Sequence, residues 1–273
     1  MSDPSVATEE PQPAPSPAGE QEPGKKGRLR TLTGEAGVEL YALPVIVIVV
    51  FLLYVWWRQT ANLDSTTLSI LDWRAIRDEL IQHIELTVVT SAIVVLLAVP
   101  LGIMVTRGRA RIVAPLVVGF ANGGQAAPSI GLIVLLAIWL GIGFWTAILA
   151  LVIYGLLPVL RNTITGLQGV DPTLVEAGRG IGMSGAAVLL RIELPLALPV
   201  IMTGIRTALV LVVGTAALAT FISAGGLGTA LVAAIELFRF PAIIASAVLI
   251  ALLALLVEWV GRVLEIVFRP KGI

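Results

Sequence analysis

The stretch that most constrains this sequence is residues 112–160, which contain no Asp, Glu, Lys, Arg or His. A helix needs about 20 residues to cross a hydrocarbon core of ~30 Å, so this stretch is too long for one crossing and indicates two. We expect the break at Gly141-Ile142-Gly143. Across the chain 57% of residues are hydrophobic and 13% are charged, whereas soluble domains carry about 25% charged residues. The sequence therefore predicts a protein whose main solvent is lipid.

Six apolar segments predict an all-α membrane protein with six transmembrane helices. The first segment opens with Tyr41 and closes with Tyr54, Trp56 and Trp57, as expected of aromatic residues at the two membrane interfaces. The expected spans are residues 41–57, 84–106, 112–140, 144–160, 200–223 and 241–268.

Two segments outside the spans differ in composition. Residues 1–40 are rich in Pro, Glu, Ser, Ala and Gly, and such a segment buries too little apolar surface to offset its ordering entropy. We expect it to be a disordered cytoplasmic tail. Residues 58–83 are expected to form an external loop, in which the pattern of residues 72–83 is typical of a short amphipathic helix.

Few residues offer reactive chemistry. The chain has no Cys and one His, which excludes thiol catalysis and Cys-ligated metals, and His83 is interpreted as an ordinary polar residue. The 18 Lys and Arg residues balance the 18 Asp and Glu residues, so net charge indicates no nucleic-acid partner. With no cluster of titratable residues in the spans, we expect no catalytic residue and no metal site.

The basic residues predict the orientation. If the N-terminus is cytoplasmic, six spans place both termini inside, and the inner segments carry the excess of Lys and Arg that the positive-inside rule requires. These inner residues are Lys25, Lys26, Arg28, Arg30, Arg107, Arg109, Arg111, Arg161, Arg179, Arg191, Arg206, Arg269 and Lys271.

The longest inner loop, residues 161–199, has the pattern of two short helices. Asp171 suits an N-cap, and Pro172 suits the first helical position. Gly182 suits the end of this first helix. A second helix is expected to begin after Ser184 and to end before Pro195.

The same loop is interpreted as a docking element rather than a connector, because a connector needs only a few residues. The helix side with Ala177 and Gly178 is nearly bare of side-chain bulk, which lets another protein approach the backbone closely. Glu176 lies beside this bare side and offers a charged side chain for contact with another protein. Surface loops of this kind often carry function.

The loop resembles the EAA motif of the permease subunits of ABC importers. In that motif Glu-Ala-Ala is followed after three residues by Gly, and nine residues later by Ile-x-Leu-Pro. The matching residues here are Glu176, Ala177, Gly178, Gly182, Ile192, Leu194 and Pro195. Gly178 replaces the usual second Ala; it keeps the small size and weakens the helix by ~1 kcal/mol.

The resemblance covers residues 80–268 approximately, and it implies a five-helix type I ABC permease core at residues 84–268, with the first span as an addition. It implies that the EAA loop is a coupling helix seated in a groove of the ATPase. It also implies a second permease chain, an extracytoplasmic solute-binding protein, transport by alternating access, and a prokaryotic inner membrane as the location.

Nucleotide binding is expected on a separate ATPase subunit, with its ATP and Mg. The sequence contains no G-x-x-x-x-G-K-[ST] loop. Gly180-Ile181-Gly182-Met183-Ser184-Gly185 fits G-x-G-x-x-G, but that pattern binds dinucleotides only between a strand and a helix, and it lies here inside the EAA loop.

Polar residues within the apolar spans are candidates for the lining of a solute pathway, because a polar group in lipid is costly unless it is paired or faces a wet cavity. Hydrogen bonds between helices are the alternative explanation. The candidates are Asn122, Gln125, Pro128, Ser129 and Thr215. A further glycine-rich segment is expected to form a tight outer turn or an outer gate, with Gly225, Gly226 and Gly228 as its key positions.

The solute is the least constrained feature. Leu157–Thr163, Glu193–Pro199 and Gly225–Gly228 resemble permeases for osmoprotectants, meaning glycine betaine, choline, carnitine or proline betaine. Permeases for methionine and other amino acids have similar stretches and remain an alternative. An ion-coupled carrier or channel is the alternative of another class, and it would call for a midplane charge or an inverted repeat.

Overall fold

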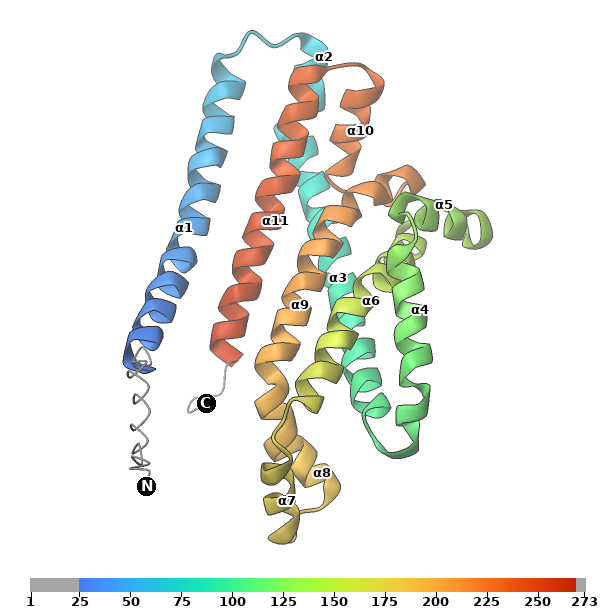
Figure 1. Cartoon of the computed structure of the whole chain (residues 1–273). Coiled ribbons are helices and arrows are strands. Elements are labelled where there is room, and N and C mark those ends of the chain that lie inside the picture. Colours follow the sequence, from blue (N-terminus) through green and yellow to red (C-terminus); the bar gives the residue numbers. More distant parts are fainter. Residues whose placement is uncertain (1–24, 269–273) are drawn as a thin grey trace, which may run out of the picture. The chain divides into compact units, whose positions relative to one another are not determined.

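The computed structural model describes the backbone of residues 25–268 and the side chains of residues 40–268. Within these residues every regular element is a helix (Figure 1). The α-helices are α1 (Lys25–Thr60), α2 (Ser65–Ile70), α3 (Trp73–Val105), α4 (Ala114–Ala126), α5 (Ser129–Leu140), α6 (Phe144–Gln168), α7 (Pro172–Gly180), α8 (Gly185–Val188), α9 (Leu194–Ala216), α10 (Gly228–Glu236) and α11 (Phe240–Phe268). Shorter helical segments are the 3₁₀ turns η1 (Gly108–Val113) and η3 (Ala217–Ile222) and the π turn η2 (Leu189–Glu193).

Five helical segments in the described part of the chain are long and apolar enough to cross a membrane. They are Leu40–Thr60, Trp73–Val105, Phe144–Gln168, Gly185–Ile222 and Phe240–Phe268. A sixth span exists only if the bent pair Gly108–Ala126 and Ser129–Leu140 counts as one crossing. The prediction of an all-helical chain with several membrane spans is thus confirmed.

The N-terminal region differs in part from the expectation. The chain divides into two units between Glu39 and Leu40, and the features below belong to the second unit. Residues 1–24 of the expected tail lie outside the described residues, whereas helix α1 already begins at Lys25. Lys, Arg, Leu and Glu are good helix formers, and no proline interrupts residues 24–43. The helix therefore extends through this stretch although Gly27, Gly34 and Gly37 each weaken it by about 1 kcal/mol.

Helix α3 joins two elements that were expected to be separate, the amphipathic helix at residues 72–83 and the second span. Asp72 caps its start and accepts hydrogen bonds from the N–H groups of Arg74 at 2.9 Å and Ala75 at 3.2 Å. No Gly or Pro follows until Pro100, so nothing in the sequence ends the helix before the span begins.

The expected span at residues 112–140 is instead broken, and its two halves meet at 99°. The break lies at Ala127, which is extended with φ −65° and ψ 142°. Extended backbone is the conformation that a following proline imposes, and Pro128 follows. The expected break at Gly141 and Gly143 is present as well, with φ of +89° and +133°.

The fifth span also differs, because the helix expected to end before Pro195 continues into it. The intervening turn η2 is a π turn, in which the N–H of Leu194 bonds to the carbonyl of Leu189. Proline lacks an N–H and crowds the carbonyl of the preceding turn, and a π turn admits such a residue without ending the helix.

The core lies where α3, α6 and α9 pack together, and α11 packs against α9 (Figure 1). Small residues permit this approach. A Cβ on Gly102 of α3 would lie 2.6 Å from Thr163 of α6, and a Cβ on Gly204 of α9 would lie 2.6 Å from Asn162 of α6. Close contact through small residues is a common basis of helix association in membranes.

Candidate functional site

The candidate site begins at the N-terminus of α7. Oδ1 of Asp171 accepts hydrogen bonds from both the N–H and the hydroxyl of Thr173, each at 2.8 Å. Pro172 occupies the first turn, where its missing N–H costs nothing. These two hydrogen bonds, the backbone one first, hold the pKa of Asp171 below its usual value. The predicted N-cap is confirmed.

The end of α7 also follows the prediction. Gly182 has φ +88°, a conformation that glycine adopts without strain. The N–H of Gly182 bonds to the carbonyl of Arg179 at 2.9 Å, and the N–H of Met183 bonds to that of Gly178 at 3.1 Å. Ser184 then caps α8 through the N–H of Ala187 at 3.3 Å.

Gly178 faces the inside of this loop, which corrects the expectation that it belongs to an outward bare side. It is buried, and a Cβ there would lie 2.6 Å from Cδ1 of Ile192. Its small size serves the packing of α7 against the returning chain. The exposed side of α7 is formed by Glu176 and Ala177 together with Leu174 and Ile181, which are 47% and 82% exposed.

The last residues of the motif anchor the loop to the membrane-spanning part. Leu194 packs against Leu167 of α6 and against Ala197 and Ile201 of α9. Pro195 lies in the first turn of α9. The motif therefore divides into the exposed residues Glu176 and Ala177 on α7 and a partly buried part, Ile192, Leu194 and Pro195, that fixes α7 to α6 and α9.

An ion pair that was not predicted from the sequence connects this loop to the turn between α3 and η1. Nη1 of Arg107 donates to Oε1 of Glu193 at 3.0 Å, and Nη2 donates to Oε2. Glu193 is 5% exposed. A bidentate pair between Arg and a buried carboxylate is strong and has a defined geometry. The two residues are 86 positions apart, so no local pattern could have paired them.

A polar cavity of about 410 Å³ lies beside this ion pair. Glu176 and Arg179 of α7 line it together with Arg107, Arg111 and Glu193. Glu176 is exposed and also borders this charged cavity, whereas the exposed apolar residues Leu174 and Ile181 do not line it. In the described part of the chain no group of three or more His, Asp or Glu residues is placed to hold a metal ion.

The candidate pathway residues are spread over the bent pair and α9. Asn122 on α4 accepts a hydrogen bond at 2.8 Å from Nη2 of Arg161 on α6, a partner that the sequence analysis assigned only to the inner loop. Gln125 and Ser129 are half-buried near the bend, and Pro128 is exposed. Thr215 bonds at 2.7 Å to the carbonyl of Leu211 in its own helix, as hydroxyls in helices commonly do.

The glycine-rich segment forms a tight turn between η3 and α10. Gly225 and Gly226 have φ of +81° and +96°. A Cβ on Gly228 would lie 1.8 Å from the carbonyl oxygen of Ala217, so only glycine fits there. This turn packs against α3 rather than standing free, since Gln82 accepts the N–H of Gly226 at 3.1 Å.

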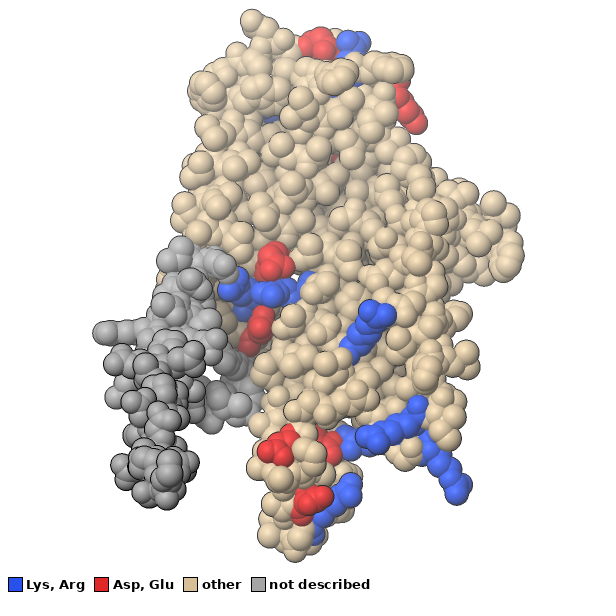
Figure 2. All heavy atoms as spheres, viewed as in Figure 1, with Lys and Arg blue, Asp and Glu red and all other residues tan. Residues whose placement is uncertain are grey.

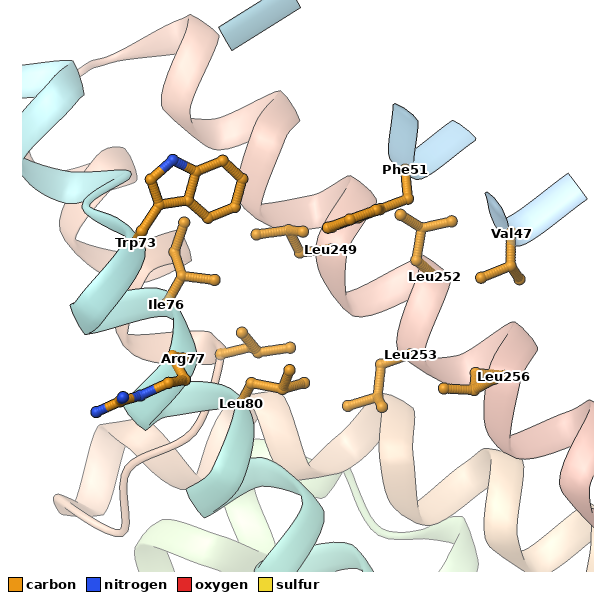
Figure 3. Close-up of a pocket in the computed structure, with 11 residues that line it drawn as sticks. Val47, Phe51, Trp73, Ile76, Arg77, Leu80, Leu249, Leu252, Leu253 and Leu256 are labelled. Carbon is orange, nitrogen blue, oxygen red and sulfur yellow. The ribbon is translucent and has the colours of Figure 1, made fainter. Parts of the chain in front are cut away.

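A second cavity, of about 310 Å³, lies between α1, α3 and α11. Figure 3 shows Leu249, Leu252 and Leu253 lining it from α11, opposite residues of α3 and α1. Its one charged residue, Arg77, pairs with Asp78 at 2.9 Å. Solute sites need a few convergent polar groups to orient the ligand, and this apolar cavity lacks them among the described residues.

The fold and the loop together define a class, the membrane-spanning component of a transport system. The family model described as "Binding-protein-dependent transport system inner membrane component" matches residues 98–267. The chain belongs to this family and is a multi-pass membrane protein.

Two related permeases match this chain over most of their own length. The glycine betaine/carnitine/choline transport system permease protein OpuCB of Bacillus subtilis (strain 168) is 40% identical over 192 residues, which are 70% of this chain and 88% of that protein. The osmoprotectant import permease protein OsmW of Salmonella typhimurium is 41% identical over 197 residues, covering 70% of this chain and 91% of that protein.

Solved structures support the fold. The MetNI methionine ABC transporter in an inward-facing conformation matches with a TM-score of 0.62 at 22% identity, covering 72% of this chain and 97% of that chain. An amino acid ABC transporter matches with a TM-score of 0.61 at 20% identity, covering 75% and 99%. At this level of identity the likeness concerns the fold alone, and it is the fold of ABC permeases.

Proposed function

We propose that this chain is the membrane-spanning permease subunit of an ATP-driven importer for a small osmoprotectant such as glycine betaine, choline, carnitine or proline betaine. The observation that carries the proposal is the identity of about 40% to permeases whose names state these solutes. The amino-acid transporters of similar fold are only 20–22% identical, so methionine is the weaker alternative. Family membership also disfavours an ion-coupled carrier or channel.

The partners in this proposal are two ATPase subunits that bind ATP and Mg, an extracytoplasmic solute-binding protein and a second permease chain. The family description, which names a binding-protein-dependent system, supports the solute-binding protein. The chain itself binds no cofactor and is not an enzyme in this scheme. Asn122, Gln125, Pro128, Ser129 and Thr215 are proposed to line the pathway between two permease chains, with Arg161 added beside Asn122 because of their hydrogen bond.

The proposed orientation places both termini and α7 in the cytoplasm. Figure 2 shows charged side chains gathered at the end of the molecule that carries α7 and α8 and again at the opposite end. A further group of acidic and basic side chains lies between the two ends, and an uncharged belt separates that group from the end opposite α7. The end with α7 holds the basic residues of the inner segments, namely Arg107, Arg109, Arg111, Arg179 and Arg191. Such a bias supports a cytoplasmic location.

Helix α7 is proposed to be the coupling helix that docks in a groove of the ATPase. Its exposed side combines a charged residue, Glu176, with the apolar Leu174 and Ile181, which suits burial in a protein interface. When ATP binding closes the ATPase pair, α7 moves with it. The partly buried Leu194 and the Arg107–Glu193 pair pass this movement to α9 and to the turn that follows α3.

The coupling role is tested by Glu176→Lys, which reverses the charge on the exposed side of α7. We expect a normal amount of inserted permease, loss of ATPase co-purification, and transport reduced at least tenfold, since an unfavourable charge at an interface costs a few kcal/mol. Glu236→Lys, the same change at the exposed end of α10, is the matched control and is expected to transport normally. Normal co-purification and transport in Glu176→Lys would contradict the role of α7.

The solute is tested by uptake of labelled glycine betaine at high salt in cells with and without this gene. We expect uptake that disappears with the gene and on depletion of ATP. A parallel assay with labelled methionine separates the two importer classes. Gene-dependent methionine uptake without glycine betaine uptake would overturn the osmoprotectant assignment, and uptake that survives ATP depletion would overturn the ATP-driven class.

A further inference from the structure

One side of α3 carries three side chains that lie against the backbone of the glycine turn and of α10. Glu79, Gln82 and His83 lie at spacings of three and four residues, so they share one helix side. Oε1 of Gln82 accepts the N–H of Gly226 at 3.1 Å, and Nδ1 of His83 accepts the N–H of Leu227 at 3.2 Å. The carboxylate of Glu79 lies near the backbone N–H of Ala230 in the first turn of α10.

The ring of His83 joins three elements at once. It is fully buried, and Nε2 lies 3.0 Å from the carbonyl oxygen of Val213 on α9. Because Nδ1 accepts from Leu227, the ring proton is on Nε2 and is donated to Val213. From the sequence His83 was interpreted as an ordinary polar residue, but both of its ring nitrogens form hydrogen bonds that connect α3, α9 and the turn.

The turn depends on these acceptors because its geometry keeps water away from its backbone N–H groups, which therefore cannot form hydrogen bonds with water instead. A Cβ on Gly225 would lie 2.2 Å from Oε1 of Gln82, and a Cβ on Gly226 would lie 3.2 Å from Nδ1 of His83. The backbone of the turn therefore lies directly on the side chains of α3. A buried N–H that loses its acceptor is costly, so the turn keeps this position only while the α3 acceptors remain in place.

We propose that Gln82 and His83, supported by Glu79, are positioning residues that hold the glycine turn of residues 225–228 shut as the outer gate, and that release of Leu227 from His83 accompanies opening toward the outside. This proposal rests on the proposed function, in which α3, α9 and the turn move relative to one another during transport. The hydrogen bonds to Gly226 and Leu227 connect neutral groups, so they are weak enough to break and re-form in each cycle.

A matched pair of substitutions separates the two bonds of His83. His83→Asn places an acceptor where Nδ1 stands but does not reach Val213. His83→Gln reaches Val213 but loses the acceptor for Leu227. Gln82→Met removes the acceptor for Gly226 while keeping the side-chain length. Thr90→Val, a buried position of the same helix, is the control for any change within α3.

The readout is ATP hydrolysis by the reconstituted complex without and with the solute-binding protein. We expect His83→Gln and Gln82→Met to raise hydrolysis without the binding protein about fivefold, the effect of losing one neutral hydrogen bond, and to lower the solute moved per ATP. His83→Asn and Thr90→Val are expected to stay near the wild type. Equal behaviour of His83→Asn and His83→Gln would overturn the proposal, since a purely structural histidine would not distinguish them.

Hydrogen exchange at the amides of residues 226 and 227 gives a second readout that does not depend on transport. We expect faster exchange in His83→Gln than in His83→Asn, and faster exchange in the wild-type complex when a non-hydrolysable ATP analogue and the binding protein are added. Exchange that is the same in both variants and unaffected by the analogue would refute the gate. If the proposed function is wrong, the result is different: the wild-type complex itself takes up no solute.

Discussion

At Gly178 the backbone of α7 lies so close to the returning chain that a Cβ would stand 2.6 Å from Cδ1 of Ile192, with Met183 and Val188 both 3.5 Å away. The nearest atom is the end of a flexible side chain, which can move aside for one methyl group but not for a branched side chain. The small size of the third motif residue is thus required by packing inside the loop. Contact with a partner is left to Glu176 and its exposed neighbours.

This packing predicts opposite results for two substitutions at one position. Gly178→Ala is expected to be close to neutral, because alanine favours the helix by up to ~1 kcal/mol and this gain offsets the displacement of Ile192. Gly178→Leu is expected to lose about 1–3 kcal/mol through overpacking and to shift α7. Thermal unfolding and ATPase co-purification measure the two effects, and unaltered co-purification by Gly178→Leu would show that Gly178 does not set the position of α7.

The Arg107–Glu193 pair marks the limit of what residue patterns can predict. The motif spacing located α7 and its exposed Glu176 correctly, since caps and small residues act over a few positions. Glu193 is close to the motif but gave no sign of being buried, and Arg107 was interpreted only as part of a positive inner turn. Only the tertiary packing of α3 against the loop brings the two within 3.0 Å.

Among the elements, α7 depends most on its ends, because a helix of nine residues is too short to be stable by propensity alone. Asp171 supplies the acceptor for its first turn. The pKa of Asp171 is lower in the folded chain than in the unfolded chain because Thr173 donates to the carboxylate. The stabilisation is therefore fully present above the ordinary pKa of an aspartate, about 3.9, and is lost as the pH falls through the lower folded value.

Because the pKa of Asp171 is lowered in the folded chain, we expect the stabilisation of α7 by its cap to be independent of pH between 6 and 8. Asp171→Ala is expected to speed amide hydrogen exchange in residues 173–176 throughout that range, and Asp171→Ser, which keeps a capping oxygen, is expected to do so less. Exchange rates corrected for their intrinsic pH dependence are the measurement. Equal exchange in wild type and Asp171→Ala would show that the cap does not hold α7.

The ends of helices were predicted correctly where a glycine or an acidic capping residue determines them. They were missed where the effect of a proline depends on the backbone around it. Gly141 and Gly182 end helices as expected, with φ of +89° and +88°. Pro128 was interpreted as an interruption within a single span and as a candidate for the pathway lining, but it forces Ala127 into an extended conformation, and the chain turns by 99° at this break. Pro195, expected to follow a helix end, lies instead inside a continuous helix because a π turn precedes it.

The family model matches residues 98–267 and does not include α1, which the sequence predicts to be an addition to the permease core. Its attachment is local. Tyr54 meets the edge of Trp73 at 6.0 Å, and Nε of Arg58 donates to the carbonyl of Leu71 at 2.9 Å. Farther along, Nε1 of Trp259 donates to the carbonyl of Leu40 at 2.8 Å.

These few contacts predict that a chain lacking residues 1–60 still inserts, folds and transports. Removal of α1 loses two hydrogen bonds, the aromatic contact, the cation–π contact of Arg58 with Trp73 and the packing of Tyr54, Val55 and Trp57 against α11. Lipid tails are as apolar as these side chains and replace much of that packing, so we expect a loss of about 1–3 kcal/mol. With α1 removed, the new N-terminus moves to the outer side, because Arg107, Arg109 and Arg111 after α3 still favour the cytoplasm.

Uptake of the solute, together with labelling of an N-terminal tag from outside, measures both expectations, and Arg58→Gln in the full chain controls for a loosened α1. If the shortened chain fails to insert while Arg58→Gln inserts normally, then α1 is needed to build the core. Removal of a helix that only flanks the core would leave the packing of α3, α6 and α9 unchanged.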